Sequence, residues 1–304
     1  MDALSSILAA LEPRGRVFCR GTLRSPWGLR GGVPMPMFHA IVRGQGMVAL
    51  PDGTMREVGG GDLVLLPRGG VHVLADSPGT EPVDLATAVC RTPGSSFGDV
   101  SRDGDGPSTT IICGMFDFTG GSHPLIDELP DVLVVHCGIG RWLEMTLDLL
   151  ADELTGDRPG CELAAGRLCE ILLVHCLRAH LSSVASRGTG FATALADPAI
   201  GRALALIHTE QEAGWRAATL ADRVGMSRSS FFGRFKQLVG EPPAGYITRI
   251  AMQRAAALLS EAGTTITVAA LAQKLGYGSE SAFGRAFTQF HGQSPGAYKR
   301  SHAS

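Results

Sequence analysis

Eight residues in the last third of the chain could form hydrogen bonds or ion pairs along two short helix faces. One set is Arg228, Ser229, Ser230, Arg234 and Lys236, and the other is Glu280, Ser281 and Arg285. Guanidinium, ammonium, hydroxyl and carboxylate groups on one side of a helix can bind phosphates and read base edges. The other side of each segment is apolar, so the eight residues are predicted to lie on the outer faces of two packed helices.

The two sets lie in an internal repeat. The first copy runs from Leu220 to Tyr246 and the second from Leu271 to Tyr298, at an offset of 51 residues that becomes 52 after the turn. Each copy opens with Leu-Ala, has a glycine five residues after the leucine, and closes with Gly-x-x-Pro-x-x-Tyr. The glycines of the turns are Gly225 and Gly276, and the phenylalanines at four-residue spacing are Phe231, Phe235, Phe283 and Phe287.

Each copy is predicted to fold as a helix, a tight turn and a second helix. The turn glycine suits a left-handed helix end, and Ser227 and Ser279 are suited to cap the second helices. The segment Ala244–Ser260 between the copies is predicted to form one amphipathic helix. A rigid spacer of this kind can hold two second helices about one DNA turn apart, roughly 34 Å.

This region resembles the DNA-binding domain of the AraC/XylS family of transcriptional regulators. The second copy, LAQKLGYGSESAFGRAFTQFHGQSPGAYKR, follows the family pattern IA..vGF.s.s.F.r.Fk...G.tP..yR. Base contacts are implied at three positions of each unit: Ser229, Phe232 and Gly233, then Glu280, Ser281 and Arg285. Gly233 departs from the family, which often has a long polar or basic side chain there, so Arg234 and Lys236 are expected to contact phosphates. The alternative is an all-α domain that does not bind DNA.

A second motif, G-x5-P-x-G-x2-H, runs from Gly61 to His72 and resembles the second motif of the cupin superfamily. It implies a strand, a turn, and a histidine that points into a β-barrel. The first cupin motif would lie near Phe38, but it lacks the paired histidines of a cupin enzyme, and its glutamate position falls on Met37. His39, on the same strand face as Met37, forms with His72 and Cys113 a candidate site for zinc or another divalent metal. The alternative is that the histidines are hydrogen-bonded core residues.

The chain has seven cysteines and no Cys-x-x-Cys pair. Cys19, Cys90 and Cys113 lie in or near the predicted barrel and are candidates for sensing an oxidant. Cys90 adjoins Arg91, and a nearby cation lowers the pKa of a thiol and favours its oxidation. The alternative is that the cysteines are small apolar residues, which we expect for Cys169 and Cys176 on a helix.

The fold class is predicted to be α+β with several domains. Residues 1–119 form a cupin-like antiparallel β-barrel, 120–195 a helical linker or dimerisation region, and 196–304 an all-α domain with two helix-turn-helix units. In the barrel, Arg91–Pro107 is predicted to be a flexible loop between two strands. In the helical region, Trp142–Leu154 and Leu163–Leu181 form a hairpin, and Ser183–Gly190 is a linker. The hairpin either joins two protomers or packs on its own barrel.

Charge is distributed unevenly along the chain. The net charge is −2 overall, but it is +5 from Ala196 to Ser304 and −7 before that, which favours a C-terminal part that touches phosphates. The start of the sequence does not have the pattern of a signal peptide, and no apolar stretch reaches about 18 residues. A cytoplasmic protein with reduced thiols and no membrane partner is therefore expected.

Taken together, these features favour a sequence-specific transcriptional regulator and not an enzyme. The input to the cupin-like domain would be a small-molecule effector, a metal or an oxidant. The resemblance implies double-stranded DNA as a partner, a homodimer, and RNA polymerase if the protein is an activator, the commoner mode in the family. Two alternatives remain: a cupin-type metal enzyme with a DNA-binding appendage, and a barrel that only dimerises.

Overall fold

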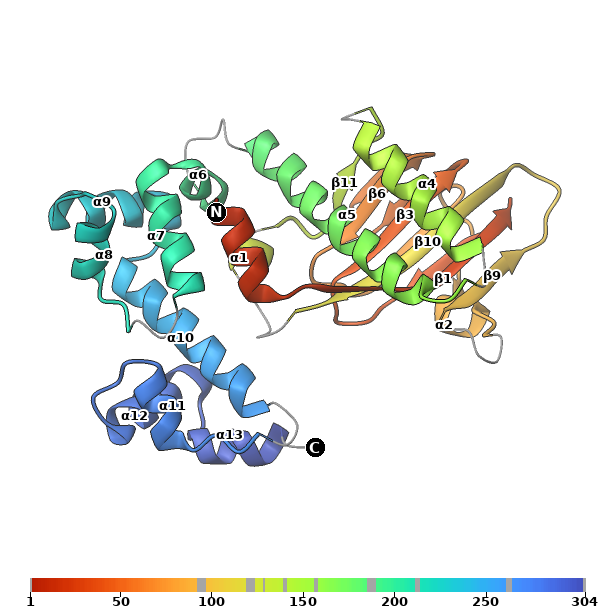
Figure 1. Cartoon of the computed structure of the whole chain (residues 1–304). Coiled ribbons are helices and arrows are strands. Elements are labelled where there is room, and N and C mark those ends of the chain that lie inside the picture. The colour runs from red at the N-terminus through yellow and green to blue at the C-terminus, as the bar shows by residue number, and fades with distance from the viewer. Residues whose placement is uncertain are drawn as a thin grey trace. The chain divides into compact units, whose positions relative to one another are not determined.

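The computed structural model describes residues 2–91, 97–118, 124–127, 129–138, 141–155, 158–184, 190–210, 214–260 and 264–302 (Figure 1). Contacts divide the chain into two units. The β unit comprises Pro13–Asp117 and Ile126–His180, and the helical unit comprises Met1–Glu12, Phe118–Leu125 and Leu181–Ser304.

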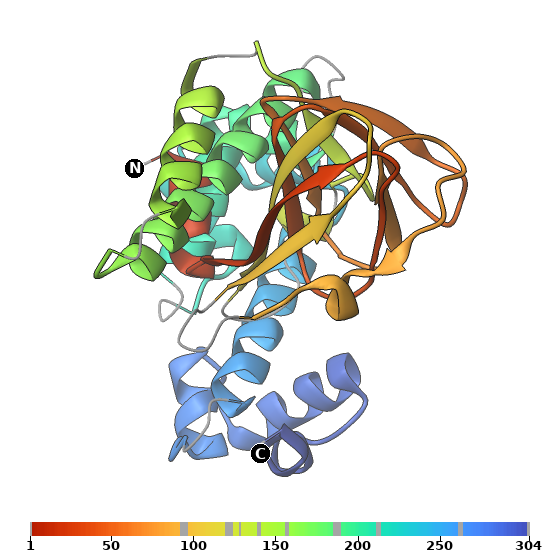
Figure 2. The same ribbon diagram turned by 90° about the vertical axis from the view of Figure 1, so that its right-hand side faces the viewer.

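The β unit contains two sheets that share one core (Figure 2). The six-stranded sheet has the order β11-β6-β3-β10-β1-β9, and the five-stranded sheet has the order β5-β4-β7-β2-β8. Neighbouring strands are antiparallel except in the pairs β1–β9 and β2–β8. The strands are β1 (Arg14–Arg24), β2 (Gly28–Gly31), β3 (Met37–Arg43), β4 (Gln45–Ala49), β5 (Met55–Gly59), β6 (Asp62–Leu66), β7 (His72–Ala75), β8 (Val83–Asp84), β9 (Gly98–Arg102), β10 (Ser108–Asp117) and β11 (Leu133–Val135).

Side chains from both sheets fill the core, which explains why the short apolar runs become strands. Leu23 and Val64 come from the six-stranded sheet, Leu29 and Leu74 from the five-stranded sheet, and all four are buried in one cluster. Trp27, just before β2, is also buried there. The predicted β-rich, cupin-like N-terminal domain is confirmed.

Two segments of the β unit differ from the sequence prediction. The predicted loop Arg91–Pro107 contains strand β9, which pairs with β1 through Cys19↔Gly98 and neighbouring residues. Residues 92–96 of that loop lie outside the described residues. The region predicted to be helical from about residue 127 contains strand β11, which pairs with β6 at the edge of the sheet. Each strand is stabilised by a partner far away in the sequence, so local patterns gave little sign of it.

The predicted helical hairpin is present as α4 (Arg141–Thr155) and α5 (Cys161–Val184), which lie along the six-stranded sheet (Figure 1). Trp142 stacks on His175 with ring centroids 3.9 Å apart, which joins the two helices. Strand β1 approaches α5 closely, because a Cβ on Gly15 would lie 2.5 Å from the Cβ of Cys169. One face of the hairpin therefore packs on the sheet of its own chain. Two short helices, α2 (Leu85–Ala88) and α3 (Pro124–Asp127), complete the elements before the hairpin.

The helical unit begins with α1 (Ala3–Leu11), capped by Asp2. Helix α1 packs against α7, although almost 190 residues separate them. The remaining helices are α6 (Phe191–Ala196), α7 (Pro198–Thr209), α8 (Ala217–Arg223), α9 (Arg228–Val239), α10 (Pro243–Ser260), α11 (Val268–Lys274), α12 (Glu280–His291) and α13 (Pro295–His302). Of the predicted linker, residues 185–189 lie outside the described residues. Within the described part, no helix is long and apolar enough to cross a membrane.

The two repeat copies fold alike, as their local signals predict. Ser227 caps α9 by accepting a hydrogen bond from the Ser230 N–H, and Ser279 caps α12 through the Ala282 N–H. Gly225 and Gly276 adopt left-handed φ angles of 74° and 75° in the two turns. Helix α10 begins at Pro243. The predicted all-α C-terminal domain with two helix-turn-helix units is confirmed.

Candidate nucleic-acid interface and a buried polar chain

Helices α9 and α12 each have an aromatic inner face that fixes their orientation. On α9, Phe231 and Phe235 are fully buried, and their rings lie tilted to each other with centroids 5.5 Å apart. Phe235 meets Tyr246 of α10 edge-on. On α12, Phe283 and Phe287 are fully buried in a cluster with the other end of α10. Helix α10 therefore contributes to the cores of both helix-turn-helix units.

The opposite faces of α9 and α12 are exposed to solvent. All ten residues predicted to contact DNA are exposed: Arg228, Ser229, Ser230, Phe232, Gly233, Arg234 and Lys236 on α9, and Glu280, Ser281 and Arg285 on α12. Packed aromatic rings behind an exposed polar face are what a helix needs to enter a major groove as a rigid body. The two faces come from one fold repeated twice.

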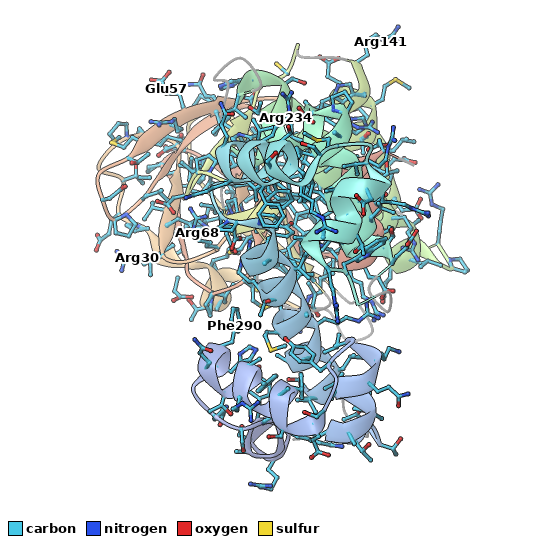
Figure 3. All side chains as sticks on the ribbon, turned by 90° about the vertical axis from the view of Figure 1, so that its left-hand side faces the viewer. Arg30, Glu57, Arg68, Arg141, Arg234 and Phe290 are labelled. Carbon is cyan, nitrogen blue, oxygen red and sulfur yellow. The ribbon has the colours of Figure 1, made fainter. Side chains whose placement is uncertain are left out.

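Arg234, which is labelled in Figure 3, lies on α9. Its guanidinium pairs with Asp197, the residue before α7. Arg234 Nε lies 2.7 Å from Asp197 Oδ2, and Asp197 Oδ1 also accepts hydrogen bonds from the N–H groups of Ala199 and Ile200. Burial alone would raise the pKa of Asp197, but the hydrogen bonds from Ile200, Arg234 and Ala199 outweigh it, so the pKa is lowered. The sequence analysis missed this role of Asp197, although Asp-Pro before an apolar run is a signal for a helix start.

On α12, two of the predicted base-contacting residues are connected. Arg285 donates a hydrogen bond from one terminal nitrogen to Ser281 Oγ over 3.0 Å, one helical turn away. This bond holds the guanidinium along the exposed face of α12, one turn from the capped end. Since Gly233 and Arg285 occupy equivalent repeat positions, 52 residues apart, the first unit has no side chain where the second has a guanidinium.

In the β unit, His39, His72 and Cys113 come together as the sequence predicts, and all three are buried. His39 Nδ1 lies 2.9 Å from Cys113 Sγ, His39 Nε2 lies 2.8 Å from His72 Nε2, and His72 Nδ1 lies 2.8 Å from the Gly70 carbonyl oxygen. Strands β10, β3 and β7 supply the three side chains, so this chain of contacts joins the two sheets. A Cβ on Gly31 of β2 would lie 2.6 Å from the His72 ring, which keeps that position clear of a side chain.

The direction of the hydrogen bonds follows from the carbonyl at the end. Since a carbonyl oxygen only accepts, His72 Nδ1 carries a proton, and neutral His72 accepts at Nε2 from His39 Nε2–H. His39 then accepts at Nδ1 from the Cys113 thiol. Burial, aided by the charge that His72 would carry, holds the pKa of His39 well below its usual value, and burial also lowers the pKa of His72. Both rings are therefore neutral near pH 7.

This arrangement does not support one metal ion shared by the three side chains. The two nitrogens of an imidazole point away from each other, and His39 faces its two neighbours with different nitrogens. A single ion would need Cys113 and His72 on the same side of that ring. In the described part of the chain, no group of three or more His, Cys, Asp or Glu residues is arranged to hold a metal ion.

The three candidate redox cysteines occupy different environments. Cys19 and Cys113 are fully buried and stand opposite each other on β1 and β10. Burial, together with a hydrogen bond to Cys19, raises the pKa of Cys113 well above its usual value. Cys90 is exposed beside β9, where its backbone pairs with Asp99. The structure thus brings two of the three together and leaves Cys90 apart from them.

A groove of about 640 Å³ lies on the β unit outside the core. Strands β4 and β5 supply one wall through Gln45, Met47 and Glu57, and Asp62 and His136 lie at another. Asp62 Oδ2 lies 3.1 Å from His136 Nδ1, and its two oxygens also accept from the N–H groups of Gly59 and Cys137. This groove combines apolar and polar walls, and sequence patterns gave no sign of it.

Comparisons with known proteins cover both units. Residues 2–182 match the family model described as Cupin, and residues 220–301 match the Helix-turn-helix domain. A protein of Streptomyces lividans named as an AraC-like transcription regulator is 33% identical over 309 residues, covering 99% of this chain and 98% of that protein. The RCS-specific HTH-type transcriptional activator RclR of Escherichia coli K12 is 26% identical, covering 98% of this chain and 97% of that protein.

Among solved structures, the DNA-binding domain of AdpA, the global transcriptional factor, in complex with a target DNA is 28% identical. The match covers 34% of this chain and 92% of the AdpA chain, with a TM-score of 0.32.

Proposed function

The chain belongs to the family of AraC-like transcription regulators with an N-terminal cupin domain, and we propose that it is a transcriptional activator that reads DNA with α9 and α12 together. The observation that carries this proposal is the pair of exposed polar faces on two capped helices that share helix α10. The relative RclR is named as an activator, which supports activation as the direction of regulation. RNA polymerase would then be a second partner.

The chemistry of the two faces assigns different tasks to their residues. Arg285, held by Ser281 on α12, suits bidentate recognition of guanine, and Glu280 suits a cytosine amino group. On α9, Phe232 and the serines Ser229 and Ser230 offer an apolar contact and short hydroxyl donors. Arg228 and Lys236 would bind phosphates and make the affinity depend on salt.

DNA selection with the full-length protein tests this proposal. A random library and the promoter region beside its own gene are used, and the enriched site is then titrated at two salt concentrations. Arg285→Ala should weaken binding to that site by about 1–3 kcal/mol and relax the preference at one base pair. Thr288→Ala, one turn further along the exposed face, serves as the control. Equal affinity of wild-type protein for the promoter and for random DNA would refute sequence-specific binding.

Dimerisation would use the outer face of the α4–α5 hairpin. Met145 and Leu149 lie one turn apart on α4 and are 56% and 57% exposed, and Leu163 and Ile171 of α5 are also exposed. The inner face of this hairpin is occupied by its own sheet. Exposed apolar side chains in a row on neighbouring helices suit a second copy of the same surface.

The input is proposed to act on the buried pair Cys19 and Cys113. Their thiols face each other across two strands, a separation that a disulfide can span. His39 Nδ1 lies 2.9 Å from Cys113 Sγ and can accept the thiol proton. Oxidation would have to overcome the burial that lowers the pKa of His39 and raises that of Cys113. Hydrogen peroxide would oxidise the pair: two thiols and one peroxide give one disulfide and two waters.

Mass spectrometry of peroxide-treated protein tests this input. A Cys19–Cys113 disulfide should form in wild-type protein and be slower in His39→Asn, and DNA affinity should change with it. Cys169, whose pKa is raised by burial to about 12, is a buried thiol with no such base and should stay reduced. Free thiols at both Cys19 and Cys113, under conditions that oxidise exposed Cys90, would refute the proposal.

A further inference from the structure

The two helix-turn-helix units meet at a pair of glycines besides sharing helix α10. Gly214 lies in the segment before α8 of the first unit, and Gly276 lies in the turn between α11 and α12 of the second. A Cβ on Gly276 would lie 2.6 Å from the Cα of Gly214, and a Cβ on Gly214 would lie 3.1 Å from the Cα of Gly276. The two backbones are therefore in direct contact, with no room for a side chain at Gly276.

Local structure holds each side of this contact in place. Next to Gly214, the indole N–H of Trp215 donates to the Leu206 carbonyl at the end of α7 over 3.1 Å. On the other side, Gly276 N–H donates to Gln273, and Tyr277 N–H donates to Ala272 at the end of α11. Around the contact, both helix-turn-helix units line a crevice of about 160 Å³ beside helix α10. These hydrogen bonds tie each side of the contact to the end of a helix.

The repeat provides its own comparison. Gly225 is the equivalent of Gly276 in the first unit, with nearly the same φ and the same pattern of backbone hydrogen bonds to α8. A Cβ on Gly225 would meet no atom within 4 Å. The left-handed turn conformation favours glycine in both copies. Only in the second copy does a neighbouring backbone also exclude a side chain.

We propose that the Gly214–Gly276 contact, together with α10, fixes the separation of α9 and α12, so that Gly276 determines which spacing between two half-sites the protein accepts. This inference rests on the proposed reading of DNA by both helices. Each end of α10 packs into one of the two helix-turn-helix units, and the glycine contact is a second point at which these units touch. A side chain at residue 276 would push the backbones apart by about 1 Å to reach an ordinary contact of 3.5–4.0 Å.

Such a shift is smaller than the rise of about 3.4 Å per base pair along a strand. We therefore expect Gly276→Ala to blur the preferred spacing and not to replace it with a new one. Each helix would still recognise its own half-site, because the residues of α9 and α12 that face the DNA are unchanged. The variant would lose the additional affinity that comes from binding both half-sites with one rigid body.

The experiment compares full-length Gly276→Ala with full-length Gly225→Ala on the site selected above. The probes are the native site, versions with one or two base pairs inserted between the half-sites, and each half-site alone. Wild-type protein and Gly225→Ala should lose at least tenfold in affinity on a one-base-pair insertion. Gly276→Ala should bind the native site about tenfold more weakly, lose less than threefold on insertion, and bind single half-sites as wild-type does.

Equal behaviour of Gly276→Ala and Gly225→Ala across the spacing series would overturn the inference. If Gly276→Ala does not fold, Gly214→Ala replaces it in the experiment, because the Cβ of that variant approaches the same contact less closely. An unchanged spacing preference in Gly214→Ala would also overturn the inference. Failure of the proposed function would look different, because wild-type protein would then select no site at all.

Discussion

Arg234 of α9 is paired with Asp197, the residue that caps α7, so the first recognition helix is joined by an ion pair to the start of a neighbouring helix. The Asp197 side chain is 5% exposed and the Arg234 side chain 55%. A buried carboxylate that loses its partner is costly, whereas the arginine can be solvated. Arg234 thus has a structural partner, and Lys236 is the residue on this helix that we expect to bind a phosphate.

This difference predicts opposite effects for two neighbouring substitutions. Arg234→Ala should lower the free energy of unfolding by about 1–2 kcal/mol and leave the salt dependence of DNA binding unchanged. Lys236→Ala should leave stability within about 0.5 kcal/mol and reduce the slope of log affinity against log salt by about 1. Chemical denaturation and binding titrations at several salt concentrations separate the two. A reduced salt slope in Arg234→Ala would assign that residue to the phosphates.

Gly233 is an open position on the exposed face of α9. A Cβ there would meet no atom within 4 Å, and the residue lies inside a helix. Gly233→Ala should therefore stabilise the protein by about 0.5–1 kcal/mol, because glycine has more backbone freedom to lose. Gly233→Arg restores in α9 the side chain that Arg285 provides in α12, so it should raise DNA affinity several-fold, and Gly233→Ala is its control. Weaker binding by the arginine variant would mean that the bases leave no space there.

The stability of the helical unit should depend on pH through His208. Its Nε2 lies 2.8 Å from the Tyr246 hydroxyl, and burial, with a smaller effect of the Arg249 charge, lowers the pKa of His208 to about 3. The unfolded chain takes up this proton near pH 6.5, but the folded chain does not. The contribution of neutral His208 to the free energy of unfolding is therefore complete above pH 6.5. It is lost as pH falls toward 3, by up to about 1.4 kcal/mol per pH unit.

Hydrogen exchange of the α7 and α10 amides at pH 7.5 and pH 5.5 measures this effect. After correction for the intrinsic pH dependence of exchange, protection should fall at pH 5.5 in wild-type protein and fall less in His208→Gln. Equal losses in both proteins would assign the acid sensitivity to other groups.

The hairpin surface should control the oligomeric state. Leu149→Lys places a charge among the exposed apolar residues of α4 and should convert a dimer into a monomer in sedimentation measurements. Glu144→Lys changes the charge on the same helix at a position about 100–140° around the helix axis from Met145 and Leu149, so it should leave the dimer intact. A dimer that persists in Leu149→Lys would place the interface elsewhere.

The sequence predicted best those features whose cause lies within a few residues. The caps Ser227 and Ser279 and the left-handed turns at Gly225 and Gly276 follow from local chemistry, so the helix-turn-helix units could be predicted almost residue by residue. Strands β9 and β11 were missed because their pairing partners are distant in the sequence. For the same reason, the sequence predicted that His39, His72 and Cys113 lie together, but not the order in which they contact one another. That order depends on which ring nitrogen faces which strand.

Helix α1 belongs to the helical unit, whereas strand β1, which begins three residues after α1 ends, belongs to the β unit. The chain crosses between the units after Glu12, after Asp117, after Leu125 and after His180. Recombination between relatives at a single point could not exchange one β unit for another without separating α1 from the helix it packs on. A chimera that keeps this packing would have to take α1 from the same parent as α7, although the whole β unit lies between them along the chain.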